Sequence, residues 1–570
     1  MSTQRDNSLK WWQTTVFYQV YPRSFADGNG DGIGDFVGLT AKLDYLKSLG
    51  VGALWLSPHF PSPNADCGYD ISDYTNVAPE YGTLDDFQRF LDEAHRRGLR
   101  VLLDLVLNHT SDQHPWFIES RSSRDNPKHD WYVWRDPAPD GGPPNNWISP
   151  FGGSAWTFDP RRGQYYYHFF LKEQPDLNWH NPQVKQAMWD AVRFWLDRGV
   201  DGFRLDAIGT IFEDPALPNH TAKVSQSEAL RVWRENLPPD EMRARLAAVM
   251  DAFRYQFGQP GVHDLMKELR ALLDTYPGDR VLIGEDEDIA YYGNGQDELH
   301  LVFNFPLMWT NRLTPAFVRA NQRDRLGRLP PGAWPCNTLG NHDSSRMRTA
   351  FGDGVHDEAI ARANAVLLLT LRGTPVLYNG EEIGMTDLIL ERFDQLRDTQ
   401  AINAYRIALQ EGISAEEALR LAVRISRDRC RTPMQWANAP NAGFCPAGVQ
   451  PWLPVNPNYA EGINVADQEH DPNSMLNLYR RAIAVRQRTP ALVRGEYEPL
   501  GDDEHVLVFL RHDSETDQRC VVAINMTAEA QTTSGHSLAM RHSRCLLSTH
   551  PQREGHTENL SKVRLEPFEA

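Results

Sequence analysis

The stretch Asp201-Gly202-Phe203-Arg204-Leu205-Asp206-Ala207 is a short apolar run that carries an arginine and, two residues later, an aspartate. Side chains alternate between the two faces of a strand, so Arg204 and Asp206 are expected to point the same way. An unpaired buried carboxylate is costly, so this charged face must be paired, solvated at a strand end, or catalytic. The heptapeptide alone fits a structural ion pair as well as an active site. Glu285 and Asp343 also end apolar runs, and this repetition favours an active site.

Eight short apolar runs, mostly bounded by Gly, Pro or polar residues, indicate strands at 16–20, 53–56, 99–105, 202–207, 281–285, 301–305, 335–339 and 376–378. Helical patterns between many of them, expected for crossovers between parallel strands, lie at 39–49, 84–97, 182–198 and 266–273. Eight such units predict an α/β fold, a TIM (β/α)8 barrel with its chemistry at the C-terminal ends of the strands. A doubly wound sheet is the alternative, but no Gly-rich phosphate turn follows the first strand.

The intervals between these runs predict the domain organisation. One interval, rich in Trp, Pro, Gly and Asp, is too long for an ordinary loop and indicates a small inserted domain. Alternating runs near the end of the chain indicate an antiparallel β domain. The predicted boundaries are 1–106 and 173–489 for the barrel, 107–172 for the insertion, 385–430 for a helical excursion within the barrel, and 490–570 for the C-terminal domain.

Charge and composition restrict the partners. The 570 residues include 58 Lys and Arg against 76 Asp and Glu, a formal charge of −18, which disfavours nucleic acid and anionic membranes and suits a neutral substrate. No signal peptide and no run of about 18 apolar residues is visible, so a soluble, cytoplasmic monomer or small homo-oligomer is predicted. The six cysteines lack CxxC spacing, which predicts free thiols.

Four segments resemble the signature segments of the α-amylase superfamily, glycoside hydrolase family 13, and occur in the same order: Asp104-Leu105-Val106-Leu107-Asn108-His109, 203–207, Ile283-Gly284-Glu285 and Asn341-His342-Asp343. Gln174-Pro175-Asp176-Leu177-Asn178 and Arg431-Thr432-Pro433-Met434-Gln435-Trp436 resemble markers of the group that contains the α-glucosidases and oligo-1,6-glucosidases. The similarity runs from about Trp11 to about Thr489. It implies an exo-acting retaining α-glucosidase that releases glucose from short α-glucosides such as maltose or sucrose.

Three alternatives to this function stay open at the level of sequence. One is a transglycosylating relative, of the sucrose isomerase or trehalose synthase type, and another is an oligo-1,6-glucosidase. A third is a non-catalytic relative of the kind that accompanies amino-acid transporters, although the membrane anchor and broken catalytic positions that it predicts are not seen.

Retaining glycosidases need a nucleophilic carboxylate and a protonated carboxylic acid about 5–5.5 Å apart. Asp206 is the predicted nucleophile, because Arg204 on the same face can hold it ionised and oriented. Glu285 is the predicted acid and then base, since it has more reach and nearby aspartates favour its protonated form. The resemblance implies that Asp343 stabilises the transition state.

Further side chains are predicted to contact the sugar. The resemblance implies that Tyr69 stacks under the glucose being cleaved and that Asp66 and Arg431 grip its non-reducing end. Cys67 departs from the asparagine common in the family. The full set of predicted substrate contacts is Asp66, Tyr69, His109, Phe169, Gln174, Arg204, His342 and Arg431. For Phe169 and the aromatic residues around it, the alternative is a small hydrophobic core of their own.

The segment Asp27-Gly28-Asn29-Gly30-Asp31-Gly32-Ile33-Gly34-Asp35 places oxygen donors at alternate positions, much as an EF-hand loop begins, but it lacks the later glutamate. A plain turn is the alternative. The resemblance implies a structural Ca²⁺ held by Asp27, Asn29, Asp31, Asp35 and the backbone carbonyl of Ile33.

The residue after the predicted nucleophile is Ala207. In the resembled group, valine here accompanies α-1,6 cleavage, whereas alanine or threonine accompanies α-1,4 cleavage. A preference for α-1,4 linkages is therefore predicted.

Overall fold

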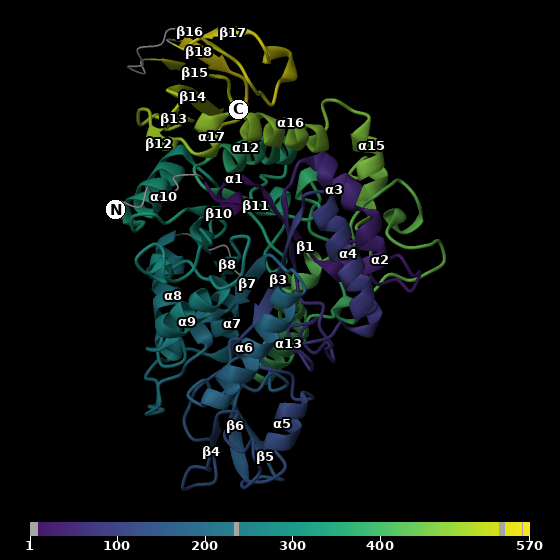
Figure 1. Ribbon diagram of the computed structural model, residues 1–570, viewed down its shortest axis with the longest axis vertical. Coiled ribbons are helices and arrows are strands. Elements are labelled where there is room, and N and C mark those ends of the chain that lie inside the picture. Colours follow the sequence, from purple (N-terminus) through teal and green to yellow (C-terminus); the bar gives the residue numbers. More distant parts are fainter. Residues whose placement is uncertain (1–8, 233–238, 535–541, 561) are drawn as a thin grey trace.

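A computed structural model describes residues 9–232, 239–534, 542–560 and 562–570, with a parallel β-barrel at its centre (Figure 1). The barrel strands are β1 Phe17–Val20, β2 Ala53–Leu56, β3 Arg100–Val106, β7 Gly202–Asp206, β8 Val281–Gly284, β9 Leu301–Val302, β10 Cys336–Thr338 and β11 Thr374–Tyr378. They pair in the order β10-β11-β1-β2-β3-β7-β8-β9. A parallel bridge between Phe303 and Cys336 joins the two ends of this sheet. The predicted TIM (β/α)8 barrel is confirmed, with each predicted run contributing one strand.

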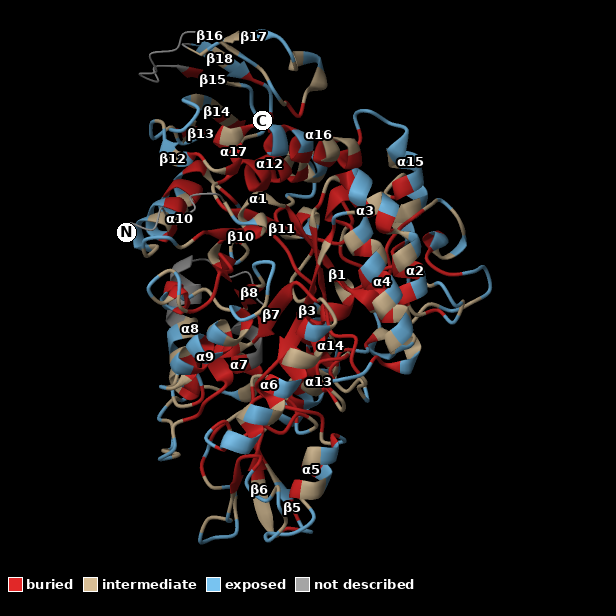
Figure 2. Cartoon of the chain, in the orientation of Figure 1, coloured by how far each residue is buried: buried red, intermediate tan, exposed pale blue. Residues whose placement is uncertain are grey.

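Helices surround the barrel and bury their apolar faces against it (Figure 2). In α4 (Leu84–Arg96), Thr83 and Asp86 form a reciprocal capping box, while Phe87, Phe90 and Leu91 are buried. The helix predicted over 39–49 is in fact two helices, α2 (Phe36–Ala41) and α3 (Leu43–Leu49). The backbone leaves the helical conformation at Lys42, where φ is −100° and ψ is 2°.

The remaining helices include crossovers between barrel strands, such as α6 (Pro182–Asp197) and α12 (Asp357–Thr370), and helices before the first and after the last barrel strand. They are α1 Trp11–Thr14, α6 Pro182–Asp197, α7 Gln226–Val232, α8 Pro239–Phe253, α9 Val262–Leu273, α10 Pro315–Arg328, α11 Met347–Ala350, α12 Asp357–Thr370, α13 Thr399–Gln410, α14 Ala415–Ile425, α15 Val465–Glu469, α16 Met475–Arg488 and α17 Pro490–Val493. Helices α13 and α14 form the helical excursion predicted after the last barrel strand. No helix in the described part of the chain combines the length and the apolar character needed to cross a bilayer.

The long interval after β3 contains a helix, α5 (Pro115–Ser120), and an antiparallel sheet of β4 (Trp134–Arg135), β6 (Gln164–Tyr167) and β5 (Trp156–Asp159). Figure 1 shows this sheet at the end of the molecule opposite the C-terminal strands. Trp147, Trp156, Tyr167 and Phe169 pack into one buried cluster. The same cluster contains Ala229, Val249, Ala252 and Phe253 of the segment between β7 and β8, so these aromatic residues share a core with that segment and do not form the separate core of the alternative prediction.

The C-terminal part is antiparallel, with β12 (Glu496–Pro499), β13 (Val506–Asp513) and β14 (Gln518–Asn525) in one sheet. Two strand pairs follow: β15 (Gln531–Ser534) with β18 (Lys562–Leu565), and β16 (His542–Arg544) with β17 (Thr557–Asn559). The buried Arg511 donates to the backbone carbonyls of Thr370 and Gly495, which fastens this sheet to the barrel helix α12. The exact domain boundaries stay a prediction.

Candidate active site

Arg204 binds three carboxylates at the C-terminal ends of neighbouring barrel strands. Strand pairing places Asp104 opposite Arg204 and Val106 opposite Asp206, and Glu285 follows directly after β8. Arg204 Nη1 donates to Asp104 Oδ1 at 2.6 Å and to Asp206 Oδ1 at 2.7 Å, while Nη2 lies 2.8 Å from Glu285 Oε1. The predicted nucleophile and the predicted acid are thus held by the two ends of one buried guanidinium.

Burial works against the negative charge of the two aspartates around this arginine. Burial raises the pKa of Asp206 well above its ordinary value, Arg204 opposes that rise, and the charges of Glu285 and Asp104 add to it. Burial likewise raises the pKa of Asp104 to about 6. Arg204 therefore favours the ionised form of Asp206, while burial and the neighbouring carboxylates favour the protonated form.

Ala207 joins the nucleophile strand to the acid. Its backbone is left-handed, with φ 40° and ψ 46°, and its N–H donates to Glu285 Oε2 at 2.9 Å. This bond leaves Glu285 held at one oxygen by Arg204 and at the other by the backbone. The side chain at position 207 consequently lies beside the predicted acid.

A second network surrounds Tyr69 and His342. Gln19 Nε2 donates to His342 Nδ1 at 2.7 Å, which places the ring proton on Nε2, 2.6 Å from the Tyr69 hydroxyl. That hydroxyl donates to Asp104 Oδ2 at 3.1 Å, as does Trp55 Nε1. Burial lowers the pKa of His342 well below its ordinary value, so the ring is neutral. The two predicted contacts are therefore linked to the Arg204 cluster.

Asp66 and Arg431, the two residues predicted to grip the non-reducing end of the sugar, lie in one network with Arg427 and Asp343. Arg431 donates through Nε to the His342 carbonyl at 2.9 Å and through Nη2 to Asp343, so its side chain is held by the loop after β10. Asp66 accepts a hydrogen bond from Arg427 Nη2 at 2.7 Å. Arg427 also lies 3.6 Å from Asp343 Oδ1. Arg427 thus lies close to both Asp66 and Asp343, and Arg431 binds Asp343 as well.

Gln174 and His109 adjoin this cluster. The Gln174 amide donates to Asp66 Oδ2 at 3.1 Å and lies 2.9 Å from His109 Nε2. Burial lowers the pKa of His109 to about 3, so this ring too is neutral. Of the predicted substrate contacts, Phe169 packs on the aromatic rings of Phe170 and Phe253.

Sequence reasoning left several buried residues of this region without a role: Gln19, Asp104, Asp398 and Arg427. Asp104 stood in a quoted motif, and Arg427 lies in the charged run Arg427-Asp428-Arg429 just before the quoted Arg431. That run was the available signal for Arg427. No local pattern pointed to Gln19 or Asp398, because their partners are distant in the sequence.

The predicted calcium loop lies before α2. Asp27 accepts from the N–H groups of Gly30 and Gly32, and Asp35 accepts from those of Gly28, Asn29 and Gly38. In the described residues no three His, Cys, Asp or Glu side chains converge as a metal site. The oxygen donors suit a hard cation in kind, whereas in this geometry they serve as turn and helix caps.

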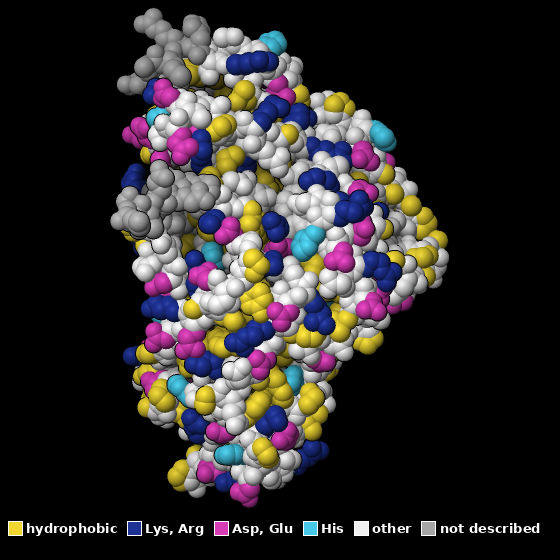
Figure 3. All heavy atoms as spheres, in the orientation of Figure 1, with side chains coloured by type: hydrophobic (Ala, Val, Ile, Leu, Met, Phe, Trp, Pro, Cys, Tyr) yellow, Lys and Arg dark blue, Asp and Glu magenta, His cyan; other side chains and the backbone are white. Residues whose placement is uncertain are grey.

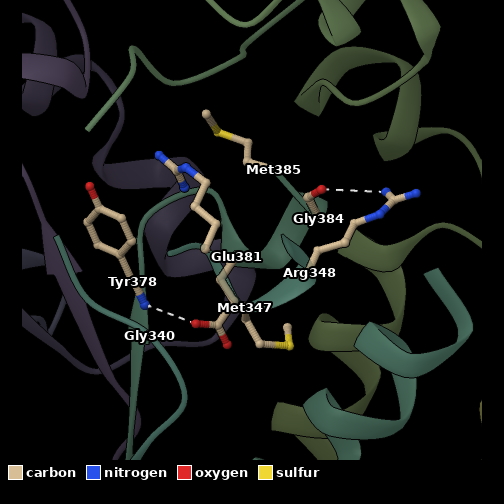
Figure 4. A pocket seen from close by; sticks show the side chains of 8 residues that line it. Gly340, Met347, Arg348, Tyr378, Glu381, Gly384 and Met385 are labelled. Carbon is tan, nitrogen blue, oxygen red and sulfur yellow. Dashed lines mark hydrogen bonds between the residues drawn. The ribbon is translucent and has the colours of Figure 1, made fainter. Parts of the chain in front are cut away.

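A separate cavity of about 10 Å³, room for about one water, lies between the loops after β10 and β11 (Figure 4). Glu381, on its wall, accepts from the Tyr479 hydroxyl at 2.8 Å and from the Tyr378 N–H at 3.4 Å. Burial raises the pKa of Glu381 to about 7. Arg346, which also lines the cavity, donates through Nη1 to the Asn379 carbonyl. This group is not bonded to the Arg204 cluster.

On the face shown in Figure 3, acidic and basic side chains are interspersed.

Comparison with known proteins identifies the family to which the chain belongs. Residues 19–495 match the model of the α-amylase catalytic domain. A probable α-glucosidase from Rhizobium meliloti is 43% identical over 534 residues, covering 92% of this chain and 90% of that protein. An oligo-1,6-glucosidase from Parageobacillus thermoglucosidasius is 40% identical over 581 residues, covering 98% of each.

Among solved structures, trehalulose synthase MutB from Pseudomonas mesoacidophila has a TM-score of 0.87 and 38% identity, over 99% of each chain. An α-glucosyl transfer enzyme has a TM-score of 0.84 and 40% identity, over 98% of each. From the match to the catalytic-domain model and these identities, the chain belongs to the α-amylase family and is a glycoside hydrolase.

Proposed function

We propose that this protein is an exo-acting, retaining α-glucosidase that releases glucose from the non-reducing end of short α-glucosides. The observation that carries the proposal is the shared hold of Arg204 on Asp206 and Glu285, at 2.7 Å and 2.8 Å. Two carboxylates on one guanidinium at adjacent strand ends suit the short separation that retention requires.

In the proposed reaction, Asp206 attacks the anomeric carbon while Glu285 gives its proton to the glycosidic oxygen, and the bond to the leaving sugar breaks. A covalent glucosyl ester on Asp206 results. Glu285, now ionised, takes a proton from water, whose oxygen attacks the same carbon and releases glucose and free Asp206. Asp343, held by Arg431, would stabilise the positive charge that develops on the sugar.

Exo action would follow from the closed end of the site. Asp66 with Arg427, and Asp343 with Arg431, place two carboxylates and two cations together. Such groups would hydrogen-bond the hydroxyls of a terminal sugar and would close this end of the site to a longer chain. Short neutral sugars such as maltose or sucrose are the proposed substrates.

The proposed linkage preference is α-1,4 over α-1,6, and its basis is Ala207. The Ala207 backbone N–H bonds Glu285, so its methyl group would lie near the leaving sugar and would leave space that a branched side chain would fill. One or two methyl groups discriminate by about 1–3 kcal/mol, so the preference would be graded.

The test of this function is glucose release by the native protein and by Asp206→Asn, which keeps the side-chain shape and removes the nucleophile. The native protein should release glucose from maltose, and the variant should lose several orders of magnitude in kcat/KM while its circular dichroism and melting temperature show a folded protein. Wild-type turnover by the folded variant would remove Asp206 from its role.

Transglycosylation is the second candidate, favoured by the similarity to an α-glucosyl transfer enzyme and a trehalulose synthase. Both reactions share the glucosyl-enzyme and differ in whether water or a sugar accepts the glucosyl group. Incubation with maltose, sucrose and trehalose, followed by chromatography, separates them. New disaccharides in excess of glucose would replace hydrolysis with transfer as the main activity.

We also propose that Ca²⁺ binds the loop of Asp27, Asn29, Asp31, Ile33 and Asp35 in a structural role. The support is its oxygen donors and its position before α2, away from the Arg204 cluster. Binding would require the carboxylates to turn from the loop N–H groups towards the ion. Calorimetric titration of chelator-treated protein with CaCl₂ tests this, with Asp31→Ala as the variant expected to bind less.

A further inference from the structure

Asp398 lies directly before α13, in the excursion after the last barrel strand, and accepts hydrogen bonds from Arg427. It is fully buried. Its Oδ2 accepts from the Arg427 backbone N–H at 2.8 Å and from Nε at 3.0 Å, and its Oδ1 accepts from Nη2 at 2.8 Å. Burial opposes ionisation, but the charge of Arg427 outweighs it and lowers the pKa of Asp398 to about 2. The contact is therefore a charged, side-on pair.

The hydrogen bonds to Asp398 fix the plane of the Arg427 guanidinium. With Nε and Nη2 bound to Asp398, Nη2 also reaches Asp66 Oδ1 at 2.7 Å, and Nη1 faces Asp343 Oδ1 at 3.6 Å. The neighbouring Thr399 hydroxyl donates to the Ala65 carbonyl at 2.6 Å, next to Asp66. The excursion is thus fastened to the Asp66 loop at two adjacent points.

We propose that Asp398 is a positioning residue that orients Arg427 at the closed end of the sugar site and so determines how strongly the terminal hydroxyl of the substrate is selected. In an α-1,4-linked chain that hydroxyl is the 4-hydroxyl, which is free only on the last sugar. The inference rests on the proposed glucosidase function and adds to it a residue that does not touch the substrate.

A purely structural role is the competing explanation, because Asp398 also accepts from the Gln400 N–H at 3.1 Å and caps α13. Asparagine caps helices about as well as aspartate. Its single carbonyl oxygen, however, cannot form a bidentate ion pair with a guanidinium. Asp398→Asn therefore separates the two roles. The matched control is Ser414→Ala, which removes the corresponding cap of α14, where Ser414 accepts from Glu417.

The experiment measures kcat and KM of the native protein and both variants with p-nitrophenyl α-glucoside and its 4-deoxy analogue. For Asp398→Asn we expect kcat/KM on the glucoside to fall by about 10- to 100-fold, mainly through KM, because a hydrogen bond to a charged group is weakened. Its preference for the glucoside over the 4-deoxy analogue should shrink by a similar factor. Ser414→Ala should lower the melting temperature and keep the native preference.

A folded Asp398→Asn protein with native KM and native discrimination would overturn the inference. Arg427→Lys removes the other member of the same side-on pair. It should also reduce the preference for the glucoside over its 4-deoxy analogue, which keeps the inference testable if Asp398→Asn does not fold. The double variant should lose little more than either single one, and fully additive losses would count against the inference. A native protein inactive on the glucoside would instead overturn the proposed function.

Discussion

Replacing Arg204 by lysine probes the feature on which the site depends. A guanidinium reaches Asp104 and Asp206 with one terminal nitrogen and Glu285 with the other. An ammonium is a single point and cannot keep all three contacts. At least one charge-assisted hydrogen bond is therefore lost, and such bonds contribute about 1.5–3 kcal/mol each. We expect kcat/KM to fall by about 10- to 100-fold for each lost contact.

The pH profile of Arg204→Lys gives a second readout with a defined sign. Burial and the neighbouring carboxylates raise the pKa of Asp206, and Arg204 opposes that rise. Weakening the opposition raises this pKa further. Because the nucleophile must be ionised, the acid limb of the kcat/KM profile should move to higher pH.

The assay is hydrolysis of p-nitrophenyl α-glucoside from about pH 4 to 9, a range that spans the ordinary carboxyl pKa and the raised values, with the melting temperature measured in parallel. Arg280→Lys is the matched control, since Arg280 binds Asp201 at 3.1 Å, at the opposite end of the strands. It should leave kcat/KM and the acid limb unchanged. A folded Arg204→Lys protein with native kcat/KM and an unmoved acid limb would refute the reasoning.

Three further predictions concern other parts of the chain. The native protein should have a higher kcat/KM for maltose than for isomaltose, and Ala207→Val should move the ratio towards isomaltose by roughly tenfold or more; it should also lower the melting temperature, because a β-branched residue at φ 40° is strained. An unchanged ratio would place linkage choice elsewhere. Glu381 has a folded-state pKa of about 7, so the native state binds a proton that the unfolded chain has lost above its ordinary pKa of 4.5. Stability should fall as pH rises from about 4.5 to 7, by about 3 kcal/mol at most, and Glu381→Gln should reduce that loss in urea titrations at pH 5 and 8; equal pH dependence in both proteins would contradict this. Chelator should lower the melting temperature more than the initial rate at 25 °C, since an ion bound only by the native state stabilises by mass action; immediate inactivation without a thermal shift would indicate a catalytic metal.

The barrel was predictable from sequence because its strands are short, apolar and separated by helical patterns. Periodicity located each strand, and the alternation of side chains placed Arg204 and Asp206 on one face. It did not locate the break at Lys42, since the apolar spacing continues through the break between α2 and α3.

Long-range partners were much less predictable. The motif at 431–436 indicated Arg431 as a substrate contact but gave no sign of Arg427, whose side chain bonds Asp66. Both arginines reach the same place, and which one bonds Asp66 depends on the backbone of the excursion, which local patterns do not specify. The raised pKa values of Asp104 and Asp206 likewise depend on burial, and burial is a property of the folded chain.

The most direct measurement of the central claim is identification of the residue that becomes covalently attached to the sugar. Incubation with 5-fluoro-α-glucosyl fluoride should trap the glucosyl-enzyme, because the fluorine at carbon 5 slows its hydrolysis. Proteolysis and tandem mass spectrometry should then find the fluoroglucosyl group on Asp206, with no label in Asp206→Asn. A label on Glu285 or Asp343, or turnover of α-glucosides with inversion at the anomeric carbon, would contradict a double displacement through Asp206.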